Sequence, residues 1–195
     1  MAETVVIEEG NGSGPTWTPL TGIVGRYCLV DAYNPGTNNP NKVPSIGFNY
    51  SFWKNHSANV SGSFNSIRDI YWYCDGNVAG DWGLDSGNGG MLQIGKRDAG
   101  DNGCPVANYA QATGTVGQSG NSIADPTNGH PYYRGQSTPV INADTCTSSS
   151  PLLIDSIVYI APFRSKIWDT QLKIPPTATH GEKAAKTFTI SYNVY

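Results

Sequence analysis

Apolar and polar residues alternate along the end of the chain, and a period of two is the pattern of a half-buried β-strand. Phe188, Ile190, Tyr192 and Val194 alternate there with Thr, Ser and Asn residues. Because the alternation continues to the last residue, the sequence predicts a strand over 187–195.

Shorter patterns predict further strands. Ile46, Phe48, Tyr50 and Phe52 alternate with Gly, Asn and Ser, which predicts a second half-buried strand. Continuous apolar runs are typical of strands that are covered on both faces, and they occur at 70–73 and 157–160. Shorter strands are expected at 27–30, 91–94, 139–141 and 167–174.

Helical periodicity is almost absent, and the single candidate, 182–186, is too short to be stable alone. The chain of 195 residues contains 23 Gly and 13 Pro, which favours many turns between short elements. These features predict an all-β fold. We expect one antiparallel immunoglobulin-like β-sandwich with long loops, the longest of them over 76–139.

The N-terminus has a separate pattern, so residues 1–15 are expected to form an arm and residues 16–195 the sandwich domain. The segment over 9–15 is Gly-rich and has the composition of a flexible linker. It follows a run of strong β-formers, Thr4, Val5, Val6, Ile7 and Glu8. Such a strand either folds back onto its own sheet or pairs with the edge of another subunit.

Composition excludes some function classes. Twelve Lys and Arg residues stand against fifteen Asp and Glu residues, and the net charge is -3 without a basic cluster. We therefore expect no nucleic-acid partner and no membrane partner, because both need positive charge or a long apolar span. Met1 is followed by Ala, Glu and Thr, which is typical of a mature start after removal of a signal peptide.

Cys28, Cys74, Cys104 and Cys146 have no metal-type spacing, so two disulfides fit them better than a zinc site. Three pairings are open. The pairing of Cys28 with Cys74 and of Cys104 with Cys146 is favoured, because sequential pairing connects near neighbours. Disulfides would imply an oxidising compartment, whereas the alternative is four buried free thiols.

Several patches share a further pattern. In Ile174–Tyr195, Gly181 precedes the last fourteen residues, and alternating apolar residues end in a tyrosine. Leu20–Cys28 leads into one cysteine, Ile70–Asp75 carries the next, and Gly90–Asp98 is a short apolar segment before a turn. Together these patches resemble the pilin and adhesin domains of chaperone–usher fimbriae. The long loops over 76–139 resemble an adhesin or tip subunit more than a shaft pilin.

The resemblance implies an incomplete sandwich that lacks its last strand. A periplasmic chaperone, and then the N-terminal arm of another subunit of the same filament, would supply that strand. Thr4–Glu8 would be the donor strand, with Val5 and Ile7 entering the neighbouring groove. The protein would then be secreted and would lie in a cell-surface fimbrium. An open edge above an exposed core must be covered in some such way to avoid aggregation.

No catalytic arrangement is evident, so we expect no enzymatic activity. The chain has neither a GxSxG nor an SxxK motif, and His56, His130 and His180 lie in loop-like sequence. No cofactor is expected, although Asp75, Asp81 and neighbouring loop oxygens would suit Ca²⁺. Asx turns explain the same residues and are favoured over a metal site.

Two loop segments have the residue types that bind sugars, namely aromatic faces for stacking and polar groups for the hydroxyls. The first contains Asp81, Trp82 and Asp85. The second contains Asn128, His130, Tyr132, Tyr133 and Arg134. A glycan receptor is therefore a candidate partner; the alternative is that these aromatic side chains cover the core.

The sequence favours a secreted fimbrial subunit of adhesin or tip type, which assembles by β-strand complementation and attaches to surfaces. One alternative is a lectin-like carbohydrate-binding module that does not polymerise. Another is an unrelated extracellular filament or surface protein.

Overall fold

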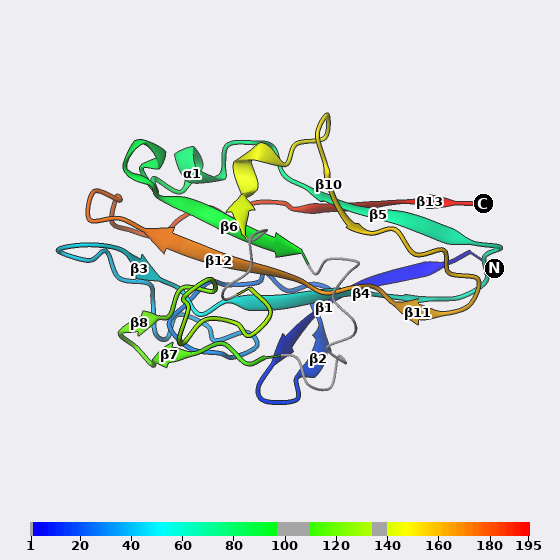
Figure 1. Cartoon of the computed structure of the whole chain (residues 1–195), viewed down its shortest axis with the longest axis horizontal. Coiled ribbons are helices and arrows are strands. Elements are labelled where there is room, and N and C mark those ends of the chain that lie inside the picture. The colour runs from blue at the N-terminus through cyan, green and yellow to red at the C-terminus, as the bar shows by residue number, and fades with distance from the viewer. Residues whose placement is uncertain (1, 97–109, 134–139) are drawn as a thin grey trace.

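The structure is a computed structural model that describes residues 2–96, 110–133 and 140–195 (Figure 1). Its larger sheet has the order β2-β1-β4-β12-β6-β9, with β11 also beside β4 and β3 also beside β12. All of these pairs are antiparallel. The strands are β1 (Thr4–Asn11), β2 (Thr16–Pro19), β3 (Asn49–Tyr50), β4 (Lys54–Ser61), β6 (Met91–Lys96), β9 (Ile141–Asn142), β11 (Phe163–Arg164) and β12 (Trp168–Ile174).

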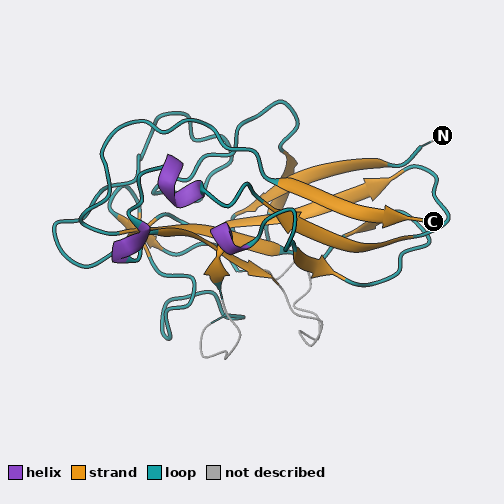
Figure 2. Cartoon of the chain, turned by 90° about the horizontal axis from the view of Figure 1, so that it is seen from above, coloured by secondary structure: helices purple, strands orange, loops and turns teal. Residues whose placement is uncertain are grey.

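The smaller sheet is antiparallel and has the order β10-β5-β13. Its strands are β10 (Leu152–Asp155), β5 (Ile67–Tyr73) and β13 (Thr189–Val194). The remaining elements of the described residues are a hairpin and three single helical turns, namely β7 (Gly114–Thr115), β8 (Ser119–Gly120), α1 (Val78–Asp81), η1 (Ser86–Asn88) and η3 (Ala143–Thr145). Figure 2 shows how strands dominate the fold, which confirms the predicted all-β class with antiparallel sheets.

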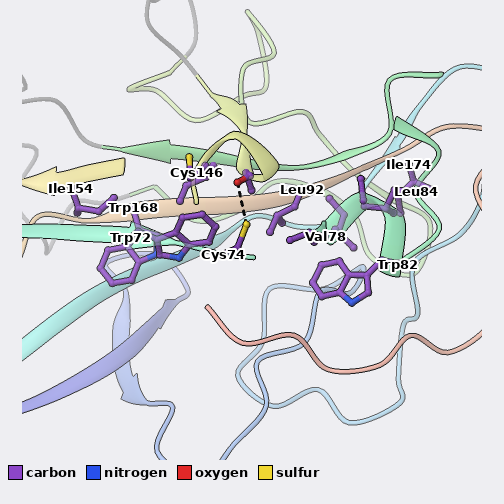
Figure 3. Close-up of a cluster of buried hydrophobic side chains, with 14 of the residues drawn as sticks. Trp72, Cys74, Val78, Trp82, Leu84, Leu92, Cys146, Ile154, Trp168 and Ile174 are labelled. Atoms are coloured by element: carbon purple, nitrogen blue, oxygen red, sulfur yellow. Dashed lines mark hydrogen bonds between the residues drawn. The ribbon is translucent and has the colours of Figure 1, made fainter. Parts of the chain in front are cut away.

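A hydrophobic core joins the two sheets (Figure 3). The smaller sheet contributes Trp72 and Ile154, and the larger sheet contributes Ile94, Trp168 and Leu172. The Trp72 ring also stacks on Phe188, with ring centroids 5.3 Å apart. Because alternate residues of a strand face opposite sides, every second position of β12 and β6 faces this core.

A second core covers the opposite face of the larger sheet, where the long loop over 110–133 packs. It consists of Phe52, Trp53, Ala112, Ile123 and Tyr133. The side-chain amide of Gln171 joins this loop to the sheet, since it accepts from the Ile123 N–H at 2.8 Å and donates to the Ser51 and Asn121 carbonyls at 2.7 Å. A Cβ at Gly95 would lie 2.8 Å from the Tyr133 ring, so this close packing requires glycine.

Several predicted strands are confirmed. The predictions over 187–195, 70–73, 91–94 and 167–174 correspond to β13, β5, β6 and β12. The prediction over 139–141 overlaps β9 only at Ile141. Val140 precedes β9, and residue 139 lies outside the described residues.

Other predicted elements are wrong. Over 46–52 only β3 forms, and the Ile46 side chain is 86% exposed. The run over 157–160 contributes a single bridge, from Tyr159 to Ile67, and it leaves Ile157, Val158 and Ile160 exposed. No strand forms over 27–30, and no helix forms over 182–186. An apolar run becomes a buried strand only where a neighbouring strand or loop covers it.

The N-terminal segment is part of the sheet. β1 pairs with β4 from Thr4 to Gly10 and with β2 from Glu8 to Asn11. The predicted linker over 9–15 is therefore wrong, because its first three residues continue β1 and the rest forms a hairpin turn. Gly12 and Gly14 have φ of 83° and 64°, which explains the glycines at this turn.

Two isoleucine substitutions test this assignment of the core. Ile94 is fully buried, so Ile94→Ala should lower the free energy of unfolding by about 2 to 5 kcal/mol. The same change at the exposed Ile46 should alter it by less than about 0.5 kcal/mol. Urea denaturation followed by tryptophan fluorescence measures both. A comparable loss at Ile46 would mean that 46–52 forms the strand that the sequence predicts.

Candidate functional site

The predicted disulfide between Cys28 and Cys74 is absent, since Cys28, Cys74 and Cys146 are buried free thiols. Cys28 donates to the Val30 carbonyl, whereas Cys74 donates to the Ala143 carbonyl in the main core (Figure 3). Cys146 is therefore not bonded as predicted, and its expected partner, Cys104, lies outside the described residues. Burial raises the pKa of all three thiols, so they stay protonated and inert.

The first predicted sugar-binding loop does not present an aromatic face. Trp82 is only 9% exposed, and its indole N–H donates to the Ala184 carbonyl at 2.8 Å. Its ring meets Tyr27 and Phe188 edge-on, with centroids 5.8 and 6.2 Å away. Trp82 is therefore part of the main core, whereas the neighbouring Asp81 is exposed and Asp85 is half-buried.

The second predicted loop is also folded inward. His130 and Tyr133 are each 1% exposed and belong to the packing around the second core. Tyr132 is half-buried, Asn128 is exposed, and residue 134, an arginine, lies outside the described residues. Trp82 and Tyr133 belong to separate cores on opposite faces of the larger sheet. The two loops therefore do not form one sugar-binding surface.

The acidic loop proposed for Ca²⁺ already contains a cation from the chain itself. The ammonium of Lys186 contacts Asp75 at 2.5 Å and also contacts Asp81. Asp85 accepts instead from Asn88. Lys186 therefore neutralises the two carboxylates that a metal ion would need, and among the described residues no group of three His, Cys, Asp or Glu side chains is placed to hold a metal.

Replacement of Lys186 tests this ion pair. The hydrogen bond from Lys186 is the main cause that lowers the pKa of Asp75. In Lys186→Met the pKa of Asp75 should rise towards its ordinary value, as ¹³C NMR titration of the carboxyl groups would show. Lys183→Met is the matched control, because Lys183 contacts Thr179 and neither aspartate. An unchanged Asp75 titration in Lys186→Met would contradict the assignment.

The sequence did not reveal a set of polar side chains inside the sandwich, here called the internal polar cluster: Glu9, Tyr27, Lys54, His56 and Thr170. The Lys54 ammonium contacts Glu9 Oε1 at 2.7 Å, and these two side chains are only 3% and 2% exposed. Lys54 also donates to the Ala32 carbonyl at 2.8 Å. The lone lysine at the start of β4 was a signal for this pair, but its partner is distant in sequence.

The rest of the internal polar cluster surrounds Thr170. Tyr27 donates its hydroxyl proton to Thr170 Oγ1 at 2.7 Å, and His56 Nε2 lies 3.1 Å from the same oxygen. The His56 ring stacks on Trp168. Burial raises the pKa of Tyr27, and it lowers the pKa of His56 to about 4. His56 is thus neutral in the folded protein at pH 7.

The His56 pKa predicts acid sensitivity. The unfolded chain takes up a proton at His56 below about pH 6.5, whereas the folded protein does so only near pH 4. Stability should therefore fall between these two values as the pH decreases, by at most about 3 kcal/mol. Urea denaturation at several pH values measures the slope. His56→Gln should flatten it and the exposed His180→Gln should not; equal slopes in all three proteins would contradict the assignment.

The C-terminal strand β13 is an edge strand. Among the described residues it pairs only with β5, so its other side has no strand beside it. β13 contains no charged residue and no proline, which are the usual protections of a sheet edge. Its partly buried Ile190 packs on the main core, and Tyr192 donates to Glu3 Oε1 at 3.4 Å.

Exposed apolar side chains lie at one end of the smaller sheet, and we call them the apolar end patch: Ile157, Val158, Ile160, Val194 and Tyr195. Ile67 connects the two segments, since it forms a bridge with Tyr159 and pairs with Val194. Figure 1 shows the C-terminus at the same end of the molecule as the described N-terminus. The Tyr159 bridge lies on the side of β5 away from β13, so the patch covers one end of the smaller sheet and includes Val194 of β13.

Comparison with family models, with curated proteins and with solved structures found no match. In the described parts of the chain, no helix has the length and apolar character required to cross a membrane.

Proposed function

We propose that this chain is an extracellular β-sandwich subunit, of a fimbrial or similar surface filament, that joins other subunits by strand addition along β13. The observation that carries the proposal is the free, uncharged edge of β13. An unprotected edge of this length templates pairing with another strand, because its outward backbone groups have no partner strand among the described residues. The adjacent apolar end patch adds surface that a neighbouring subunit can bury.

The edge of β13 suits the role of strand acceptor, whereas β1 does not suit the role of donor strand. For Thr4–Glu8 to serve as the donor strand, β1 would have to leave β4, with which it pairs over seven positions. It would also separate Glu9 from Lys54, and an unpaired buried charge is strongly unfavourable. We therefore assign the acceptor edge to β13 and keep β1 within its own sheet. The donor strand comes from a partner subunit.

A lectin-like function has less support. The aromatic rings of Trp82 and Tyr133 are buried in two different cores, so neither offers a stacking face. Attachment to a surface receptor then depends on other residues or on other subunits of the filament.

A charge placed on β13 tests the proposal. Ser191 lies near the middle of the strand and is half-buried, so Ser191→Lys should weaken self-association at least about tenfold, or about 1.4 kcal/mol. Ser191→Thr keeps a neutral β-former there and should associate like the unmodified chain. Sedimentation velocity over a concentration series measures the change.

Ser148→Lys is the matched charge control, because Ser148 is exposed in the loop between η3 and β10 and is not part of β13. It should leave association unchanged. The proposal fails if the unmodified chain stays monomeric at all concentrations and binds no strand peptide, or if Ser191→Lys and Ser148→Lys have the same effect.

A further inference from the structure

Three residues of the β1–β4 pair share one face of the larger sheet. The register of these strands pairs Gly10 with Asn55, so the next position places Asn11 opposite Lys54. Glu9 lies two residues before Asn11 and therefore faces the same side. Directly opposed side chains of antiparallel strands have Cβ atoms about 5 Å apart. Lys54, Asn11 and Glu9 thus form a compact group.

One carboxylate oxygen contacts both nitrogens of this group. Glu9 Oε1 accepts from Lys54 Nζ at 2.7 Å and from Asn11 Nδ2 at 3.0 Å. Asn11 Nδ2 also donates to Asp31 Oδ1 at 2.8 Å, while Asp31 Oδ2 accepts from the Gly12 N–H. The side-chain amide of Asn11 is therefore held by two carboxylates.

The amide oxygen of Asn11 is in a contrasting position. Asn11 Oδ1 is buried and has no hydrogen-bond partner among the described residues. A buried carbonyl without a donor is unfavourable and is rarely retained without a reason. The amide is thus held at its nitrogen, next to an amine, in a site from which water is largely excluded.

We propose that Lys54 and Asn11 form an intramolecular isopeptide bond, with Glu9 as the group that moves the proton. Lys54 Nζ, after giving a proton to Glu9, attacks Asn11 Cγ. The bond from Cγ to Nδ2 then breaks, and the leaving nitrogen takes the proton from Glu9 and departs as ammonia. One N–C bond forms and one breaks, so no oxidant or reductant is needed. The lysine ammonium loses two protons in all: the first reaches the leaving nitrogen through Glu9, and the second converts the released ammonia to ammonium.

The surroundings fit each step. Glu9 Oε1 touches both the nucleophile and the leaving group, so the proton moves without rearrangement of the site. The Ala32 carbonyl and Glu9 hold the Lys54 amine in place, which lowers the entropic cost of the attack. Burial of Lys54 and Glu9 protects the product from hydrolysis. The bond would join β1 to β4 covalently. This inference is independent of the proposed strand addition at β13.

Peptide mapping of the full purified chain tests the bond. Asn11 lies in the tryptic peptide 1–26, and Lys54 ends the peptide 43–54. Trypsin does not cleave after an acylated lysine, so the bond predicts a branched product in which 1–26 is joined to 43–68. Its mass should be lower than that of the two peptides by one ammonia. Recovery of unmodified 1–26 and 43–54 as the main products would overturn the proposal.

Asn11 is followed by Gly12, and an Asn-Gly pair also loses ammonia when it closes to a cyclic imide. That product leaves 1–26 unbranched and Lys54 cleavable, so it counts against the isopeptide bond. A branched product that has lost water instead would place the acyl group on Glu9 or Asp31, and it also counts against the assignment.

Variants assign the roles. Asn11→Ala should abolish the branched peptide, and Glu9→Gln should abolish it or slow its formation at least about tenfold, the loss expected for a general base. Asn59→Ala is the matched control, because the Asn59 amide donates to Glu8 on β1 at 3.1 Å without a lysine beside it. This variant should keep the branched peptide. If the branched peptide persists in full in Asn11→Ala, the proposal is overturned, even if Glu9→Gln fails to fold.

Discussion

The position of the N-terminal strand depends on the buried ion pair between Lys54 and Glu9. Neither charge can stay inside the sandwich without the other, since removal of one partner of a buried pair costs about 3 to 5 kcal/mol. A slip of β1 by one residue would turn Glu9 to the other face of the sheet and separate the pair. The pair therefore selects one register of β1 against β4, and the turn and β2 follow from that register.

With this register β1 has neighbouring strands that β13 lacks. β1 pairs with β4 on one side. On its other side β2 covers the second half of β1, so among the described residues only the first half of β1 lacks a neighbouring strand there. β13 has a single neighbour among the described residues and no charge to discourage another. The buried pair of Glu9 and Lys54 thus lies in the larger sheet, whereas the smaller sheet keeps an edge on which strands can add.

Periodicity was enough to predict the strands that are covered. β13, β5, β6 and β12 combine alternation or apolar runs with partners on both sides or with a core below. The segments at 46–52 and 157–160 have equally good patterns, but the Ile46 and Ile160 side chains are 86% and 76% exposed. Local sequence records which residues suit a strand, and it does not record whether another element will cover them.

The polar interior shows the same limit more sharply. Glu8 and Glu9 before a Gly-rich segment look like the start of a solvated tether, yet both are buried. Their meaning depends on Arg164 and Lys54, which are brought to them only by the fold. The aromatic residues of the loops depend on the fold in the same way, since a loop that packs on a sheet buries its Trp and Tyr side chains. Some of the few charged side chains of this protein are therefore paired in its interior. β13 itself carries no charge, so electrostatic repulsion does not oppose backbone pairing at that edge.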